Sequence, residues 1–387
     1  MLSKLPLVFS NDELPTSSFS CGPGQGLPSV RNARLYETFF ERSHRAADIT
    51  FEGLYKECTE NLRHLLNIPA DYTVLFFPGG VTPAMDTILW SLAQDTICGV
   101  DIGAFSHLWC ADLAGRLPDV TRRFVTADEY FLPNGLPDPN ASLILLTPNE
   151  TATGVQLPDD YLQQVWQNRG SNTLVAWDTT SCAGGRNLPV GTYDIQIFGL
   201  QKCLGAGGGT CCMVLSPRAV ERAQHPLRNL PFFLDLRNAL AYTSKYQTLN
   251  TPSTINIWMA NEACKWMLAR GGIKEMENLC KQHADYLVTW AKNSPYFKPL
   301  IAQDKYRSFT TLTLAITHPH ITGQQIAQIL RDTGKQNLAD GLKKYRTVAQ
   351  ESLRIACFPF VDTDGVEQYK KLTAMLDKIA QRLSNQH

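Results

Sequence analysis

Short apolar runs alternate with amphipathic stretches along the first two thirds of the chain. A strand that is covered on both faces carries few polar positions, so such runs predict a largely parallel sheet buried between helices. The runs lie at 73–77, 142–147, 174–177, 195–200 and 210–215. Helical stretches such as 83–90 and 161–167 separate them. An earlier amphipathic helix is indicated by the stripe Leu54, Cys58, Leu62 and Leu65.

The last third of the chain follows a different pattern and predicts a smaller α+β domain. Two strands are expected at 309–315 and 352–357, with a helix at 323–332 between them. The final helix carries one apolar stripe, which predicts that it packs on the small sheet: Val366, Tyr369, Leu372, Leu376, Ile379 and Leu383. We therefore expect an N-terminal arm at 1–15, a large α/β domain at 16–265 and a small domain at 266–387, with a break close to Gly271-Gly272.

Composition narrows the class of partner. The 387 residues include 36 Lys and Arg and 36 Asp and Glu, so the net charge is zero and nothing favours binding to nucleic acid or to an anionic membrane. The N-terminus resembles neither a signal peptide nor a membrane span. The 11 cysteines form no CxxC pair, which argues against a metal site and favours a reduced cytoplasm. Small molecules and other copies of the chain are the expected partners.

The apolar run 195–200 leads directly into Gln201, Lys202 and a glycine-rich turn. A lysine buried between strands is costly unless it is paired, lowers its pKa or condenses with a carbonyl. The run 174–177 ends in an acid, Asp178. A lysine that binds an aldehyde and an acid that pairs with a cationic ring nitrogen suit pyridoxal 5'-phosphate. Each residue taken alone would more often be structural, but the pair with its glycine loop predicts this cofactor.

Other strand ends carry groups that suit the same cofactor. The run 73–77 meets Gly79-Gly80-Val81 and then a helix, which predicts a phosphate cradle of free amides at a helix N-terminus. The run 142–147 leads into a polar cluster in which Thr151 is the obvious donor. Between them, Phe105 and Trp109 each offer a ring for stacking.

Three positively charged segments are candidates for anion binding. Arg354 interrupts an apolar strand, and either a substrate carboxylate or a salt bridge within the domain would compensate its charge. His44 and Arg45 precede a helix, where a solvated surface is the more common use; if they instead face a cleft, they suit a phosphate or carboxylate. Arg346 belongs to a basic turn.

Together these motifs resemble the phosphoserine aminotransferases, a group within the class V (fold type I) enzymes that use pyridoxal phosphate. The matching stretches span nearly the whole chain in the order of the family: Phe19-Ser20-Cys21-Gly22-Pro23, Ser43-His44-Arg45, Pro148-Asn149-Glu150-Thr151, Asp178-Thr179-Thr180-Ser181, Gln201-Lys202, Asn250-Thr251-Pro252, and Tyr345-Arg346 followed by Leu353-Arg354-Ile355. Details such as Gln201-Lys202-Cys203 are similar to the actinobacterial and archaeal branch.

The resemblance implies a role for each matching residue. Lys202 would hold the cofactor and Asp178 would pair with its ring nitrogen. The other cofactor contacts implied are Gly80, Val81 and Gln201 at the phosphate, Trp109 stacked on the ring, Thr151 at the ring hydroxyl, and Asn250 and Thr251 reaching over from a neighbouring subunit. The substrate contacts implied are Arg354 at the α-carboxylate and His44, Arg45 and Arg346 at the phosphate.

The activity implied is transfer of an amino group from glutamate to 3-phosphohydroxypyruvate, which gives 2-oxoglutarate and O-phospho-L-serine in serine biosynthesis, in a homodimer with shared active sites. Phosphohydroxythreonine or a specialised amino acid stays open as the substrate. The chain departs from the family at Tyr345, where many relatives have histidine, and at Cys21.

Three other activities compete with this one. Another class V aminotransferase, with a donor such as alanine, is the main alternative. A cysteine desulfurase fits less well because Gln201 stands where those enzymes usually carry histidine. A dinucleotide-binding dehydrogenase would need a helix after the glycines at 205–209, whereas an apolar strand follows.

Overall fold

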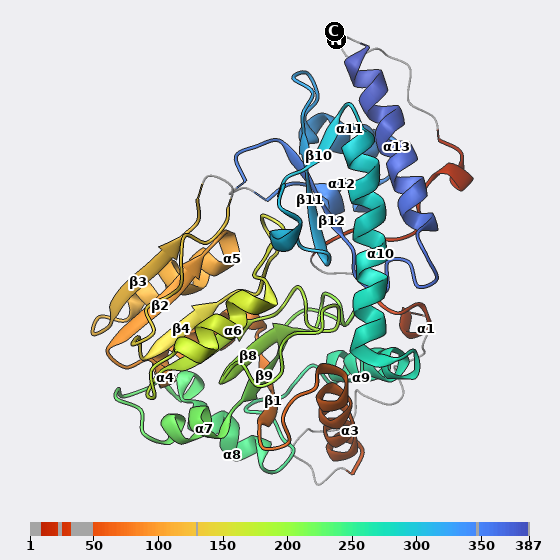
Figure 1. The fold of residues 1–387 in the computed structure, drawn as a ribbon. Coiled ribbons are helices and arrows are strands. Elements are labelled where there is room, and N and C mark those ends of the chain that lie inside the picture. The colour runs from red at the N-terminus through yellow and green to blue at the C-terminus, as the bar shows by residue number, and fades with distance from the viewer. Residues whose placement is uncertain (1–8, 22–24, 32–48, 129–130, 346–347, 386–387) are drawn as a thin grey trace.

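The computed structural model describes residues 9–21, 25–31, 49–128, 131–345 and 348–385, which form two packed units (Figure 1). The larger unit is built on a seven-stranded sheet and the smaller one on a three-stranded sheet. The long helix α10 (Gly272–Asn293) runs from the larger unit, where it contacts α3 and α9, to β10 and α13 of the smaller one.

The large sheet has the strand order β1-β9-β8-β7-β4-β2-β3. The five strands from β8 to β3 are parallel, and β9 is antiparallel to both of its neighbours. Every residue of β4, β7 and β8 is buried, because helices cover both faces of the sheet. The strands are β1 (Thr73–Pro78), β2 (Thr96–Asp101), β3 (Thr121–Thr126), β4 (Leu143–Leu146), β7 (Leu174–Asp178), β8 (Ile195–Gly199) and β9 (Thr210–Leu215). A separate ribbon pairs β5 (Asn149–Glu150) with β6 (Val155–Gln156).

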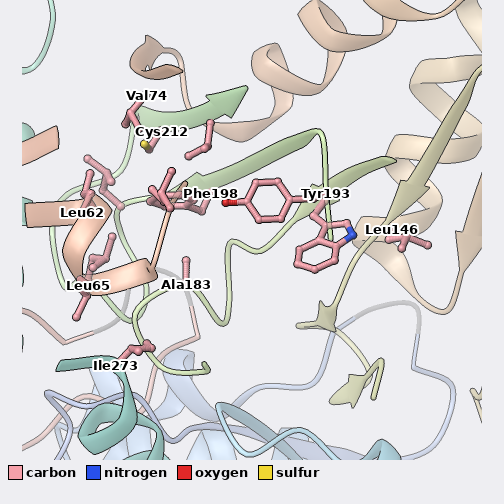
Figure 2. Close-up of a cluster of buried hydrophobic side chains, with 14 of the residues drawn as sticks. Leu62, Leu65, Val74, Leu146, Ala183, Tyr193, Phe198, Cys212 and Ile273 are labelled. Atoms are coloured by element: carbon pink, nitrogen blue, oxygen red, sulfur yellow. The ribbon is translucent and has the colours of Figure 1, made fainter. Parts of the chain in front are cut away.

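Two hydrophobic clusters attach the helices to this sheet. On one face, Leu62 and Leu65 lie in the same cluster as Phe198 and Cys212 of the sheet (Figure 2). The helices that contribute to this cluster include α3 (Ile49–Leu66), α6 (Asp159–Asn168), α9 (Thr254–Ala269) and the start of α10. The helices on the other face are α4 (Val81–Leu92), α7 (Pro217–Gln224) and α8 (Leu236–Thr243). The sheet therefore lies between two helical layers.

The small unit packs its helices on an antiparallel sheet of β10 (Phe297–Pro299), β11 (Thr311–Ile316) and β12 (Ser352–Ala356). Its helices besides α10 are α11 (Gly323–Asp332), α12 (Gln336–Leu342) and α13 (Glu367–Ser384). Thr322 and Gln325 form a capping box at the start of α11, which satisfies backbone N–H groups that the helix leaves free. The predicted stripe of α13 lies in the core of this unit, apart from the partly buried Val366 at its edge.

A segment near the N-terminus belongs to the same core. Leu14, Phe19 and Cys21 are buried with the small unit, and the carbonyl of Phe19 accepts a hydrogen bond from the amide of Ala356 at 3.1 Å. This segment thus lies beside β12, although most of it falls within the range expected for the large domain.

The remaining helical elements are short. They are η1 (Asn11–Glu13), α1 (Pro28–Arg31), α5 (Ala104–His107), the π-helical turn η2 (Leu108–Leu113), η3 (Ala114–Arg116), η4 (Phe232–Leu234) and η5 (Asp304–Tyr306). Within the part of the chain that the structure describes, no helix combines the length and the apolar character that crossing a bilayer requires.

The predicted fold class is confirmed: a mostly parallel sheet lies between helices, and a smaller α+β unit follows. The helix expected at 323–332 matches α11. The helix expected at 83–90 begins two residues earlier, at Val81. Pro83 falls in its first turn, where a missing N–H breaks no helical hydrogen bond.

Candidate active site

A cavity of about 510 Å³ lies where the carboxyl ends of the parallel strands meet the small unit. The large unit contributes most of its wall, the small unit contributes Tyr345 and Arg354, and the N-terminal segment contributes Cys21. The predicted residues that line it are Gly80, Val81, Thr151, Asp178, Gln201, Lys202 and Arg354. A larger groove of about 700 Å³ lies between α6, α10 and η5, but it contains none of the predicted residues.

Lys202 forms the floor of this cavity. Its side chain is 6% exposed, and its Nζ donates a hydrogen bond to Thr151 Oγ1 at 2.8 Å. Burial lowers the pKa of Lys202, although the nearby Cys21 and Asp178 favour the charged form. Such an amine is closer to its neutral, reactive state than a lysine in water.

Asp178 is the last residue of β7 and is buried beside Lys202. Its Oδ1 accepts hydrogen bonds from the amide of Thr180, at 3.0 Å, and from the Thr180 hydroxyl. Burial raises the pKa of Asp178, and the two bonds from Thr180 oppose this. A cation brought into the cavity would therefore find a carboxylate that is already oriented.

Two glycine loops meet at one end of the cavity. The amide of Gly79 donates to the carbonyl of Gly209 at 2.9 Å, which ties the two loops together. Gly80 has φ 83° and ψ −160°, a conformation that is essentially restricted to glycine, and α4 begins at the next residue, Val81. Gln201 lines the same cavity. Its Oε1 lies so close to Gly199 that a Cβ added at Gly199 would come within 2.2 Å of it. The amides at this helix start can receive a phosphate.

The aromatic wall is formed by Phe105. Its ring centroid lies 5.1 Å from Lys202 Nζ and 5.3 Å from the ring centroid of Tyr345. Trp109 does not line the cavity, in contrast to the stacking role implied for it. Its indole is 1% exposed and packs in the hydrophobic cluster between the sheet and α4, where its large apolar area is removed from water.

Arg354 projects from β12 toward the cavity without an anionic partner among the described residues. Its guanidinium lies 5.5 Å from the ring centroid of Tyr345, and its buried Nε has no hydrogen-bond partner among those residues. Its side chain also contacts the Cys21 thiol, whose pKa is raised by burial, so the structure favours an arginine open to a ligand anion over a salt bridge within the domain.

The other predicted site residues fall into two groups. His44, Arg45 and Arg346 lie outside the described residues. Asn250 and Thr251 are exposed, and Thr251 lines a separate small hollow of about 100 Å³.

Two further residues were not given a role on the basis of sequence. Asn149 donates to Ser181 Oγ at 2.7 Å and to Thr311 Oγ1 at 3.0 Å, and so joins three segments at the cavity wall. Glu150 is completely buried next to Thr151. The only sequence signal for either was its position in the polar cluster that follows β4.

These residues fit a phosphorylated aromatic aldehyde with a basic ring nitrogen. Lys202 could meet the aldehyde, Asp178 the ring nitrogen, and the start of α4 the phosphate, because all three line one cavity. A Cβ added at Gly80 would meet no atom within 4 Å, so the cradle has room for a ligand group.

Comparison with known proteins agrees with this chemistry. Residues 33–368 match a model of the family described as aminotransferase class-V. The phosphoserine aminotransferase of Rhodococcus opacus, an actinobacterium, is 30% identical over 384 residues, which cover 97% of this chain and 98% of that protein.

Solved structures share the fold. A phosphoserine aminotransferase from Cytophaga hutchinsonii superposes with a TM-score of 0.81 at 24% identity and covers 95% of this chain and 99% of that one. An alanine–glyoxylate aminotransferase from Nostoc gives 0.77 at 20% identity, with 97% and 98% covered. At these identities the likeness establishes the fold and does not discriminate between substrates.

Proposed function

The chain belongs to the class-V aminotransferase family, and from this premise we propose that it is a transaminase that uses pyridoxal 5'-phosphate. The observation that carries the proposal is the buried Lys202, bonded to Thr151 and placed beside Asp178 in one cavity. In transamination, pyridoxal phosphate supplies an electron sink for the substrate's α-carbon when it is bound.

The residues of the chain would divide the remaining tasks. Lys202, Asp178 and Thr151 would hold the cofactor's ring, and Gly80, Val81 and Gln201 would hold its phosphate. Once the incoming amine has displaced it, Lys202 would act as the base at the substrate's α-carbon. Its lowered pKa favours the neutral amine that this task requires.

Arg354 is the residue that we propose for the substrate's α-carboxylate. Its guanidinium lines the cavity with no anion beside it among the described residues, and a guanidinium binds a carboxylate through two parallel hydrogen bonds. We further propose that His44, Arg45 and Arg346 bind the second anion, which is the phosphate of phosphoserine or the side-chain carboxylate of glutamate.

For the substrates, we propose glutamate with 3-phosphohydroxypyruvate, giving 2-oxoglutarate and O-phospho-L-serine, as in serine biosynthesis. The nearly full-length match to a protein named phosphoserine aminotransferase supports this choice. The alternative, an alanine-type activity, is not favoured, because the curated relatives at about 30% identity are named phosphoserine aminotransferases.

We also propose that the enzyme is a cytoplasmic homodimer in which Asn250 and Thr251 reach the cofactor of the partner subunit. Both residues are exposed in the single chain and lie outside its own cavity, so a contact across an interface would give them a role. All eleven cysteines are free and buried, which suits a reducing compartment.

Steady-state rates with phosphoserine and with alanine, each with 2-oxoglutarate as acceptor, test the substrate. We expect phosphoserine to be the better donor by kcat/KM. Arg45→Ala should reduce kcat/KM for phosphoserine about tenfold to a hundredfold, because a hydrogen bond to a charged group contributes about 1.5–3 kcal/mol, and it should affect alanine much less.

Arg331→Ala provides the matched control. Arg331 lies on α11 and pairs with Asp340, away from the cavity, so both rates should stay unchanged. A preference of the native enzyme for alanine, or equal losses for both donors in the Arg45 variant, would refute phosphate recognition.

A further inference from the structure

Glu150 makes an unusual set of contacts for a residue with no assigned task. Its carboxylate is completely buried beneath the cavity wall. Oε2 accepts hydrogen bonds from the amides of Phe105, at 3.1 Å, and Ser106, at 2.9 Å, and from the Ser106 hydroxyl at 3.1 Å. Oε1 accepts from the amide of Ala152 at 2.9 Å.

These four bonds connect two segments that are distant in the sequence. Phe105 and Ser106 belong to α5, whereas Ala152 lies in the turn after β5. The two segments approach closely at Gly103, where an added Cβ would come within 2.5 Å of the Glu150 side chain. Glu150 therefore fixes the position of α5 relative to the turn.

Both connected segments present a side chain to the cavity. Phe105 provides the aromatic wall, 5.1 Å from Lys202 Nζ. Thr151, the neighbour of Glu150 in the chain, bonds to Lys202 Nζ at 2.8 Å. The distance between the ring and the hydroxyl thus depends on the carboxylate that joins their backbones.

We propose that Glu150 is a positioning residue for the cofactor: it holds Phe105 against one face of the pyridoxal ring and Thr151 beside Lys202. The proposal rests on the proposed function, because it names the residue that sets the geometry of the same site. Glu150 does not line the cavity, so it would act through Phe105 and Thr151 and not by contact with the cofactor or the substrate.

The chemistry of the contacts explains why the residue is a glutamate. A carboxylate accepts hydrogen bonds at both oxygens, and here both oxygens face backbone N–H groups. In Glu150→Gln, either orientation of the amide places its NH₂ group against an N–H. An aspartate would keep the charge but would be one methylene too short to reach both segments.

The test measures binding of pyridoxal phosphate to the cofactor-free protein by absorbance titration, together with amide hydrogen exchange over 104–107. We expect Glu150→Gln and Glu150→Asp to weaken cofactor binding at least about tenfold, to accelerate exchange at Phe105 and Ser106, and to shift the absorption band of the bound cofactor. Glu150→Asp keeps the negative charge and shortens the side chain. If only the charge of Glu150 mattered, this variant would bind the cofactor nearly as well as the wild type.

Glu277→Gln is the matched control. Glu277 accepts a hydrogen bond from the amide of Asn187 at 2.6 Å, outside the cavity, so its variant should lose stability while keeping cofactor affinity and exchange at 104–107. If Glu150→Gln fails to fold, Ser106→Ala removes one of the four donors and should weaken cofactor binding about twofold to tenfold.

The outcomes separate the two proposals. Failure of the native protein to bind pyridoxal phosphate would refute the proposed function. Normal binding by the native protein, with unchanged affinity in the folded Glu150 variants or in Ser106→Ala, would refute the positioning role alone.

Discussion

Lys202 is an amine held in surroundings that disfavour its charge. Its side chain is 6% exposed, and burial outweighs the attraction of Cys21 and Asp178, so its pKa lies below the ordinary value of 10.5. In the unfolded chain the same lysine is solvated and keeps its proton to higher pH. Between the two pKa values the unfolded state therefore binds more protons than the folded state.

This difference predicts how stability changes with pH. As the pH rises from the lowered pKa toward 10.5, the cofactor-free wild type should gain stability relative to Lys202→Met, by at most about 1.4 kcal/mol per pH unit. Urea unfolding of both cofactor-free proteins, at pH values from about 7 to about 10, measures how the free energy of unfolding of each protein changes with pH.

The methionine variant also serves as a test of the chemistry. It should show no visible absorbance of lysine-bound cofactor and no transamination. Identical pH slopes for the two proteins would mean that Lys202 has an ordinary pKa when folded.

Single residues also show which parts of the site could be predicted from the sequence and which could not. Lys202, Asp178 and Thr151 were predicted from their positions after apolar runs, and the structure places them on one cavity. Phe105 and Trp109 are only four residues apart, and from the residue pattern alone either ring could stack on the cofactor. Packing separates them, because Trp109 fills the core beside α4 while Phe105 faces the cavity.

At the level of elements, the start of α4 combines two features that suit an anion. Gly79 and Gly80 both have positive φ, 86° and 83°, so their backbone can turn the amides toward the cavity. The helix that follows has 12 residues, and its N-terminal amides carry partial positive charge. The sequence predicted this element because an apolar run is followed at once by two glycines and a helix start.

Replacing Gly80 tests the cradle. Gly80→Ala should reduce the free energy of unfolding by about 1–3 kcal/mol, since alanine is strained in this conformation. It should also weaken binding of pyridoxal phosphate more than binding of pyridoxal, which lacks the phosphate. Calorimetric titration of the cofactor-free protein with both compounds gives the two affinities.

Gly334→Ala is a suitable comparison. Gly334 also has positive φ, 75°, and space for a Cβ, but it lies between α11 and α12 in the small unit. Gly334→Ala should reduce the free energy of unfolding by an amount similar to that for Gly80→Ala, without any change in cofactor binding. Equal losses of affinity for pyridoxal phosphate and pyridoxal in the Gly80 variant would contradict a phosphate-binding role.

At the level of the whole molecule, the cavity is assembled from segments that are distant in the chain. Lys202 and Asp178 come from the large unit, and Tyr345 and Arg354 come from the small one. Local patterns predicted the strands and helices well, because periodicity depends on near neighbours. They did not predict that residues 14–21 join the small unit, or that Glu150 connects two loops, because these contacts depend on how remote segments pack.

The proposed dimer gives a test at this scale. In solution the protein should have twice the 43.2 kDa mass of the chain. Lys202→Ala and the double variant Asn250→Ala/Thr251→Ala should each have little activity. Refolding the two together should restore activity, because one site of the mixed dimer then has both intact contributions.

Asn278→Ala is the control for this experiment, since Asn278 is exposed on α10 and does not line the cavity. Its activity should stay close to wild type. A monomeric mass, or no recovery after mixing, would argue against sites shared between subunits.

The contact between Phe19 and Ala356 has a consequence for synthesis on the ribosome. The large sheet uses residues 73–215, so it can fold while the rest of the chain is still being made. The core around Leu14 and Phe19 also needs α13, which ends at Ser384. The segment that carries Leu14 and Phe19 must therefore wait for the small unit to be synthesised before it can dock, and the cavity, to which Cys21 and Arg354 contribute, is completed only then.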